Sequence, residues 1–163
     1  MSASVRPISA ADEEWVRGAI RARWGGETVV SRGAVWEPAR LPGFVAEEGG
    51  RPVGLITYRD AGDECEIVTI DALVPRAGVG TILIEAVVAA ARAAGRTRVW
   101  LITTNDNLDA LRFYQRRGFV LAALHRDAVA GSRVLKPSIP AVGAHGIPIR
   151  DELELERRLE VEG

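Results

Sequence analysis

The sequence has few of the residues that crosslink a chain, bind a metal or span a membrane. Of its 163 residues one is cysteine, Cys65, and two are histidine. A lone cysteine excludes a disulfide within the chain, and two isolated histidines offer no converging set of metal ligands. No apolar run approaches the ~20 residues of a membrane-spanning helix, and the first residues lack the apolar core of a signal peptide. We therefore expect a cytoplasmic protein with no metal site and no membrane partner.

An excess of charge of one sign is also lacking. The chain carries 21 basic and 22 acidic residues, so its formal net charge is −1. Such a balance gives no electrostatic footprint for nucleic acid, and we expect no nucleic-acid partner. With 47% hydrophobic and 26% charged residues, the composition is typical of a globular domain long enough to bury a core. The sequence predicts one domain over residues 1–163.

The most informative segment begins at Glu64. A β-type run over residues 64–74 leads into a glycine turn, Pro75-Arg-Ala-Gly-Val-Gly-Thr81, which opens a long apolar helix. Gly78 and Gly80 allow the backbone to approach a ligand closely. The first N–H groups of a helix have no partner within it and favour negative charge. The turn therefore predicts an anion site.

Two familiar phosphate-binding motifs do not fit this turn. A P-loop requires Gly-Lys-Ser/Thr after its spacer, and a dinucleotide-binding fold requires a third glycine, which would fall at Leu83. Neither requirement is met.

A second motif follows about a dozen residues after the helix. Residues 107–119 read Asn-Leu-Asp-Ala-Leu-Arg-Phe-Tyr-Gln-Arg-Arg-Gly-Phe, follow a β-rich run over 98–104, and predict a helix that ends at Gly118. With the glycine turn, this Asn-x-x-Ala-x-x-Phe-Tyr-x-x-x-Gly-Phe string resembles the GCN5-related N-acetyltransferase family over about residues 43–125. A departure from the family is Pro75, where members usually carry Gln or Arg.

The resemblance implies a binding site for acetyl-CoA as cosubstrate. It implies that the glycine turn holds the pyrophosphate, with the residues Arg76, Ala77, Gly78, Val79, Gly80 and Thr81. It also implies that the fourth and fifth strands splay apart, so that backbone groups near Ala72 and Leu73 can pair with the pantetheine arm. Asn107 would cap the helix that begins at the second motif, bond the pantetheine, or do both.

The resemblance also implies a mechanism. Tyr114 would protonate the departing thiolate, and a carboxylate would accept the proton of the amine. Glu66 is our predicted base, because Glu66-Ile-Val resembles the strand on which histone-acetylating relatives carry theirs. Glu64 and Asp71 are rivals. In a regular strand Asp71 would face opposite to Glu66, but a β-bulge would reverse the facing beyond it.

The alternation of strand and helix over residues 64–125 predicts a right-handed β-α-β crossover. Together with a short strand at 5–8, a helix at 11–23 and a hairpin about Gly49-Gly50, it predicts an α/β (α+β) fold with a mixed, mostly antiparallel sheet and helices on both faces. Residues 27–41 are irregular. Alternating apolar residues over 147–159 predict a last strand, preceded by an unusual insert at about 126–148. This insert is a lid, a contact between subunits of a homodimer, or a surface loop.

Three functions remain open at this point. The first is an enzyme that transfers an acetyl group to a primary amine of a small molecule or peptide. The second is a module that senses acyl-CoA without turnover, and the third is a scaffold whose tail mediates dimerisation. The acceptor pocket would use Trp24, Arg32 and Trp36, which lie where family members usually build it.

Overall fold

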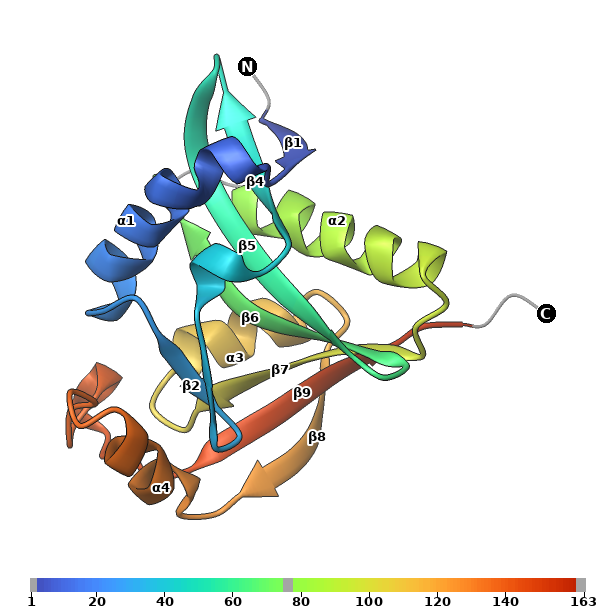
Figure 1. Cartoon of the computed structure of the whole chain (residues 1–163). Coiled ribbons are helices and arrows are strands. Elements are labelled where there is room, and N and C mark those ends of the chain that lie inside the picture. The colour runs from blue at the N-terminus through green and yellow to red at the C-terminus, as the bar shows by residue number, and fades with distance from the viewer. Residues whose placement is uncertain (1–2, 75–77, 161–163) are drawn as a thin grey trace.

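The computed structural model describes residues 3–74 and 78–160. One sheet joins seven strands in the order β1-β4-β5-β6-β7-β9-β8 (Figure 1). Their bounds are Ser4–Pro7 (β1), Gly43–Glu48 (β4), Arg51–Ala61 (β5), Glu64–Ala72 (β6), Arg98–Thr104 (β7), Val120–His125 (β8) and Glu152–Arg158 (β9). Only β6 and β7 pair in parallel, and the other neighbours in this sheet are antiparallel. The predicted mixed, mostly antiparallel sheet is confirmed.

Helices cover both faces of this sheet. They are α1 (Glu13–Trp24), α2 (Val79–Ala93), α3 (Leu108–Gln115) and α4 (Ala128–Leu135). Val16 and Ile20 of α1 pack with Leu55 of β5 in one buried cluster, whereas α2 and α3 contribute to the cluster on the opposite face. This two-sided covering also matches the prediction.

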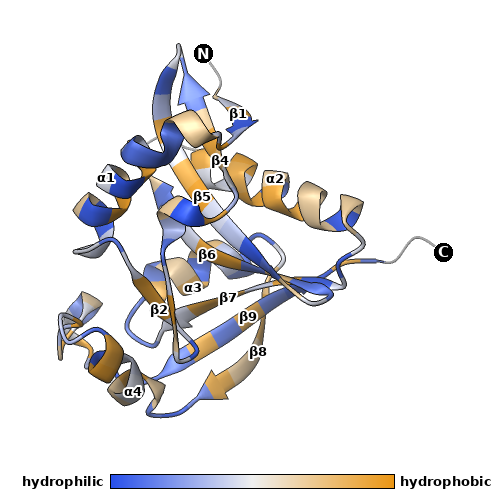
Figure 2. Ribbon diagram, in the orientation of Figure 1, coloured by the Kyte–Doolittle hydropathy of each residue, from blue (hydrophilic) through white to orange (hydrophobic). Residues whose placement is uncertain are grey.

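Helix α2 forms the crossover between the parallel strands β6 and β7. Leu83, Ile84, Val87 and Val88 are fully buried, and Figure 2 shows how hydrophobic residues dominate this helix. Each such side chain contributes roughly 1.5–3 kcal/mol through removal of apolar surface from water. Packing of α2 against β4, β5 and β6 therefore fixes the position of its N-terminus relative to the end of β6.

Three elements differ from the sequence prediction. The stretch expected to be irregular contains a hairpin of β2 (Val29–Ser31) and β3 (Ala34–Trp36). The insert at 126–148 contains α4, which packs near β2. The last strand begins only at Glu152, since residues 147–151 are irregular apart from an isolated bridge between Pro148 and Val142.

Candidate functional site

Strands β6 and β7 part in the middle of the sheet. They pair from Glu64 with Arg98 to Ile67 with Leu101, but β6 continues to Ala72 and β7 to Thr104. Within these described strands, the residues beyond Ile67 and Leu101 have no partner across the gap. The predicted splay is confirmed, and it leaves backbone groups of both strands unpaired.

Only part of the end of β6 faces this gap. The N–H of Leu73 donates to the carbonyl oxygen of Val53 at 2.9 Å, so this backbone N–H points towards β5 and away from the gap. Because the direction of backbone groups alternates along an antiparallel strand, the N–H and C=O of Ile70 and Ala72 point towards β7. Of the two residues near which backbone groups were predicted to pair with the pantetheine arm, Ala72 faces the splay, whereas the N–H of Leu73 already bonds to β5.

A β-bulge interrupts β6 where the splay begins. Thr57 of β5 pairs with Thr69, but the next residue, Tyr58, pairs with Ile67. Val68 is therefore an extra residue on β6, and the facing of side chains reverses beyond it.

This reversal brings two candidate bases to the same face. Asp71 pairs with Leu55, which packs against α1, whereas Ile67 and Ile70 pack on the face of α2. Glu66, next to Ile67, also points to the face of α1, where it meets Ser31.

The splay opens into a cavity of about 630 Å³. Its walls come from β6, β7, the start of α2, the segment that begins α3, and the end of α1. Its lining residues include Arg23, Trp24, Ile70, Asp71, Ala72, Gly78, Gly80, Thr103, Asn107, Asp109, Phe113, Tyr114 and Arg117.

Gly78 and Gly80, the two glycines of the predicted turn, line the cavity. Gly78 has φ +90° and precedes α2, a backbone conformation that favours glycine. The N–H groups of Val79, Gly80 and Thr81 are in the first turn of α2 and have no partner within the helix. Val79 itself is buried in the core. Arg76 and Ala77, the other residues predicted to hold the pyrophosphate, lie outside the described residues.

Gly80 is required by the close approach of α3 to α2. A Cβ atom there would lie 2.6 Å from Cζ of Phe113, well inside van der Waals contact. Arg117 continues this contact, because its guanidinium lies 3.7 Å from the centre of the Phe113 ring and its Nε donates to Oγ1 of Thr81 at 2.8 Å. Sequence reasoning missed Arg117; the only available signal was a pair of arginines before Gly118.

Tyr114 lines the same cavity from α3. Its ring packs edge-on against Phe113 and Phe119, with centroid distances of 5.3 and 5.7 Å. Burial, with a further contribution from the negative charge of Asp71, raises the pKa of the Tyr114 phenol well above its usual range. The phenol therefore stays protonated at neutral pH and can act as a proton donor.

Asp71 lies on the wall of this cavity. Its Oδ2 accepts a hydrogen bond from Nε1 of Trp24 at 3.0 Å. Burial raises the pKa of Asp71, an effect that the bond from Trp24 and the charge of Arg23 oppose. A carboxylate with a raised pKa is a better proton acceptor than an ordinary aspartate.

Glu66 and Glu64 have different surroundings. Glu66 is 1% exposed, pairs with Nε of Arg59 at 2.6 Å and accepts from Oγ of Ser31 at 2.7 Å. Glu64 pairs with Arg98 at 3.1 Å. Neither is among the described residues that line the large cavity. The role of Glu66 as base stays a prediction, and this placement favours its rival Asp71.

Asn107 begins α3 and lines the cavity. Its Oδ1 accepts a hydrogen bond from the N–H of Ala110 at 3.3 Å, so the predicted capping role is confirmed. Its second predicted partner, the pantetheine, stays a prediction.

The three residues expected around the acceptor do not lie together in one site. Trp24 lines the cavity. Trp36 instead packs under Arg59, whose guanidinium carbon lies 4.2 Å from its ring. Arg32 occupies the turn between β2 and β3.

Two other properties of the described residues bear on function. Among them, no group of three or more His, Cys, Asp or Glu side chains is placed to hold a metal ion. No helix that they form is both long and apolar enough to cross a membrane.

Together these groups can perform three tasks. The start of α2 can bind an anion, and the free backbone of Ile70 and Ala72 can pair with an extended ligand. A proton acceptor and a proton donor, Asp71 and Tyr114, share the cavity between them.

Known proteins share both the sequence pattern and the fold. The chain matches the Acetyltransferase (GNAT) family over residues 13–119. It is 42% identical to protein YdhI of Bacillus subtilis (strain 168), over 80% of this chain and 82% of YdhI. A Bacillus subtilis acetyltransferase solved in complex with CoA superposes with a TM-score of 0.71 at 18% identity, over 98% of this chain and all of that one. A GNAT family acetyltransferase from Elizabethkingia anophelis with acetyl-CoA bound gives a TM-score of 0.67 at 16% identity, over 96% and 98% of the two chains.

Proposed function

This chain belongs to the acetyltransferase (GNAT) family, and on that premise we propose that it transfers the acetyl group of acetyl-CoA to a primary amine. The observation that carries this proposal is the shared cavity, in which Asp71 and Tyr114 lie at the strand splay and Gly78 and Gly80 at one end. An acetyltransferase needs these components together, namely a phosphate site, a channel for the thioester, a base and an acid.

Acetyl-CoA would bind from the glycine turn to the splay. We assign its pyrophosphate to the backbone N–H groups of residues 78–81 at the start of α2, with Arg117 beside Thr81. The pantetheine arm would run along β6 and pair with Ile70 and Ala72 as a strand would, reaching Asn107. The likeness to structures that hold CoA or acetyl-CoA supports this assignment.

The reaction would be a direct transfer. The amine nitrogen attacks the thioester carbon, its proton passes to the carboxylate of Asp71, and a C–N bond forms. As the C–S bond breaks, the sulfur takes the phenolic proton of Tyr114, so that the products are an amide and CoA thiol. The free N–H groups on the splayed strands would stabilise the oxyanion. Asp71 is preferred to Glu66 because it lines the cavity, whereas Glu66 is held by Arg59 and Ser31.

Replacement of Tyr114 tests this proposal. Release of CoA thiol from acetyl-CoA is followed over a panel of primary amines for the wild type and Tyr114→Phe. General acid catalysis typically contributes 10²–10⁴-fold, and we expect kcat to fall by at least about a hundredfold with unchanged affinity for CoA. Tyr58→Phe is the matched control, because Tyr58 stacks on Phe44 and is not among the described residues lining the cavity.

The outcomes separate the enzyme from its main alternative. CoA binding without thiol release for any amine would indicate a sensor of acyl-CoA. Full activity of Tyr114→Phe would remove Tyr114 from the mechanism.

A further inference from the structure

A second, smaller cavity adjoins the large one. Its volume is about 160 Å³, and it shares Trp24, Ile67, Val68, Ile102, Thr103 and Asn107 with the large cavity as lining residues. The two cavities therefore meet where β6 and β7 part. The small one is lined by residues of β2 and α4, and neither Gly78 nor Gly80 is among the described residues that line it.

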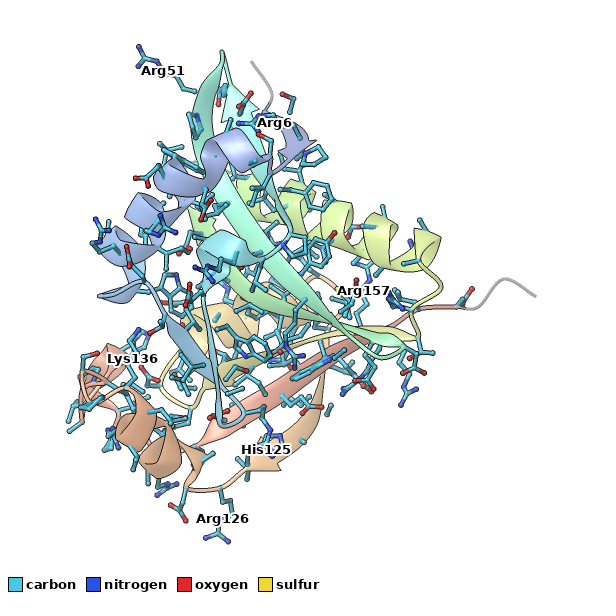
Figure 3. The ribbon with its side chains drawn as sticks, in the orientation of Figure 1. Arg6, Arg51, His125, Arg126, Lys136 and Arg157 are labelled. Carbon is cyan, nitrogen blue, oxygen red and sulfur yellow. The ribbon has the colours of Figure 1, made fainter. Side chains whose placement is uncertain are left out.

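The segment over 126–148 forms one wall of this small cavity. Val129 and Ser132 of α4 and Ile139 line it, opposite Val29 and Ser31. Lys136, labelled in Figure 3, lies next to the end of α4 and fixes the wall, because its Nζ donates to the carbonyl oxygens of Trp24 and Thr28 at 2.9 and 2.8 Å.

Glu152, at the start of β9, also lines this cavity. It is only 3% exposed. Its Oε1 accepts from Oγ of Ser132 at 3.0 Å, and its Oε2 accepts from the backbone N–H of Arg32 at 3.4 Å. A carboxylate offers about four acceptor positions, so these two bonds leave acceptor capacity unused.

Glu152 lacks the cationic partner that a buried carboxylate usually requires. Within residues 3–74 and 78–160, no basic side chain lies within ion-pair distance of it, whereas nearby Glu66 pairs with Arg59. Glu152 is also the only charged side chain among the described residues that line the small cavity. Burial of an unpaired charge is costly, and a ligand that carries a positive charge would offset that cost.

The other lining groups suit an ammonium group on a short apolar chain. An ammonium has three donors, and the hydroxyl oxygens of Ser31 and Ser132 can accept alongside Glu152. The remaining wall is mainly Val, Ile and Thr. At about 30 Å³ for each water-sized group, the volume accommodates roughly five such groups.

We propose that the acceptor is a short α,ω-diamine, with one amine presented to Asp71 and the other bound by Glu152 in the small cavity. This inference rests on the proposed acetyl transfer, because it names the substrate class of the same site. It assigns to Glu152 a role in selecting the acceptor, and none in moving a proton.

The test compares matched acceptors. Short α,ω-diamines of graded length and n-alkylamines of equal length are assayed with acetyl-CoA by thiol release. A hydrogen bond to a charged group contributes enough for a preference of about ten- to a hundredfold, so kcat/KM should be at least tenfold higher for the best diamine. In Glu152→Gln this ratio should fall close to one.

Glu154→Gln is the matched control variant. Glu154 lies on the same strand, but it pairs with Arg98 and His125 and is not among the described residues that line the small cavity. It should keep the preference for diamines. A shift of melting temperature with CoA verifies that both variants are folded.

Direct binding separates this inference from the proposed function. If no amine releases thiol, the proposed acetyl transfer is refuted. Calorimetry of the diamine against the CoA-saturated protein still tests the role of Glu152 in that case. Diamine binding by the wild type that is weaker in Glu152→Gln would support the site. Equal kcat/KM for diamines and alkylamines, or the same ratio in Glu152→Gln as in the wild type, would overturn the proposal. Equal heats for wild type and variant, where nothing turns over, would do the same.

Discussion

Replacement of Asp71 by Asn removes the proposed proton acceptor with almost no change in shape. In the wild type, Nε1 of Trp24 donates to Oδ2 of Asp71 at 3.0 Å. Asn keeps a carbonyl oxygen that can accept this hydrogen bond. The only essential loss is the capacity to take a proton from the amine. Asp71→Asn therefore isolates base catalysis from cavity shape.

The expected loss of activity is large. A general base contributes typically 10²–10⁴-fold, which corresponds to about 3–5 kcal/mol of transition-state stabilisation. We expect kcat/KM of Asp71→Asn to fall within that range, with little change in the Kd of CoA. The assay is initial-rate thiol release at saturating acetyl-CoA, with calorimetry for CoA binding.

The raised pKa of Asp71 adds a prediction about pH. Catalysis needs the deprotonated form, so wild-type kcat/KM should fall as pH falls through this pKa, above the usual aspartate value of about 3.9. The folded state also binds this proton more tightly than the unfolded chain does. The charged form therefore opposes folding above that pKa, and Asp71→Asn should unfold in urea with a free energy equal to or above that of the wild type.

Asp109→Asn serves as the control, because Asp109 lines the same cavity but its side chain is 85% exposed. It should retain most of the activity. If Asp71→Asn kept more than about a third of wild-type kcat/KM while Glu66→Gln lost activity, the base would be Glu66 and the assignment of Asp71 as proton acceptor would be wrong.

Three further variants or reactions test the surroundings of the site. Gly80→Ala places a methyl group against Phe113, and such overpacking costs about 1–3 kcal/mol. The melting temperature, followed by circular dichroism, should therefore fall, and CoA should bind more weakly. An unchanged affinity for CoA would argue against the glycine turn as its binding site. Arg59→Met leaves the buried carboxylate of Glu66 without its cationic partner, so urea unfolding should show a loss of about 3 kcal/mol. Glu66→Gln leaves no buried charge and should lose less. Equal losses for the two variants would contradict the cost assigned to the buried unpaired charge. Burial raises the pKa of the Cys65 thiol to about 12, so a disulfide reagent should label it only after denaturation, and rapid labelling of the folded protein would contradict its burial.

The sequence predicted the part of the fold in which local signals agree with tertiary structure. The run over 64–74 and the apolar stripe after Gly78 and Gly80 indicated a strand and a crossover helix, and both are present as β6 and α2. Tyr114 lies in the cavity as its motif implied.

The elements that the sequence did not reveal depend on tertiary contacts. The turn between β2 and β3 has Arg32 at φ +51° and Gly33 at φ +76°, so arginine occupies a position where turns of this kind usually carry Asn or Gly. Helix α4 is only eight residues long and contains Gly131, and burial of Val129 and Ser132 holds it in place rather than helix propensity.

The preferred base could not be chosen from the sequence for a geometric reason. Whether Asp71 or Glu66 reaches the cavity depends on the bulge at Val68 and on the partners of Glu66, Arg59 and Ser31. Arg59 lies on the neighbouring strand β5, seven residues before Glu66, and Ser31 lies in the hairpin of β2 and β3, 35 residues away. No local pattern around Glu66 distinguishes a structural ion pair from a free carboxylate.

Product analysis of a single turnover tests the central claim most directly. The protein is mixed with a stoichiometric amount of acetyl-CoA and a primary amine, and mass spectrometry follows the amine, CoA and the chain together. Direct transfer across the splayed strands predicts one acetylated amine for each CoA thiol released and no acetyl group on the protein at any time. Acetylated protein that precedes the product, or thiol release without acetylated amine, would contradict the account.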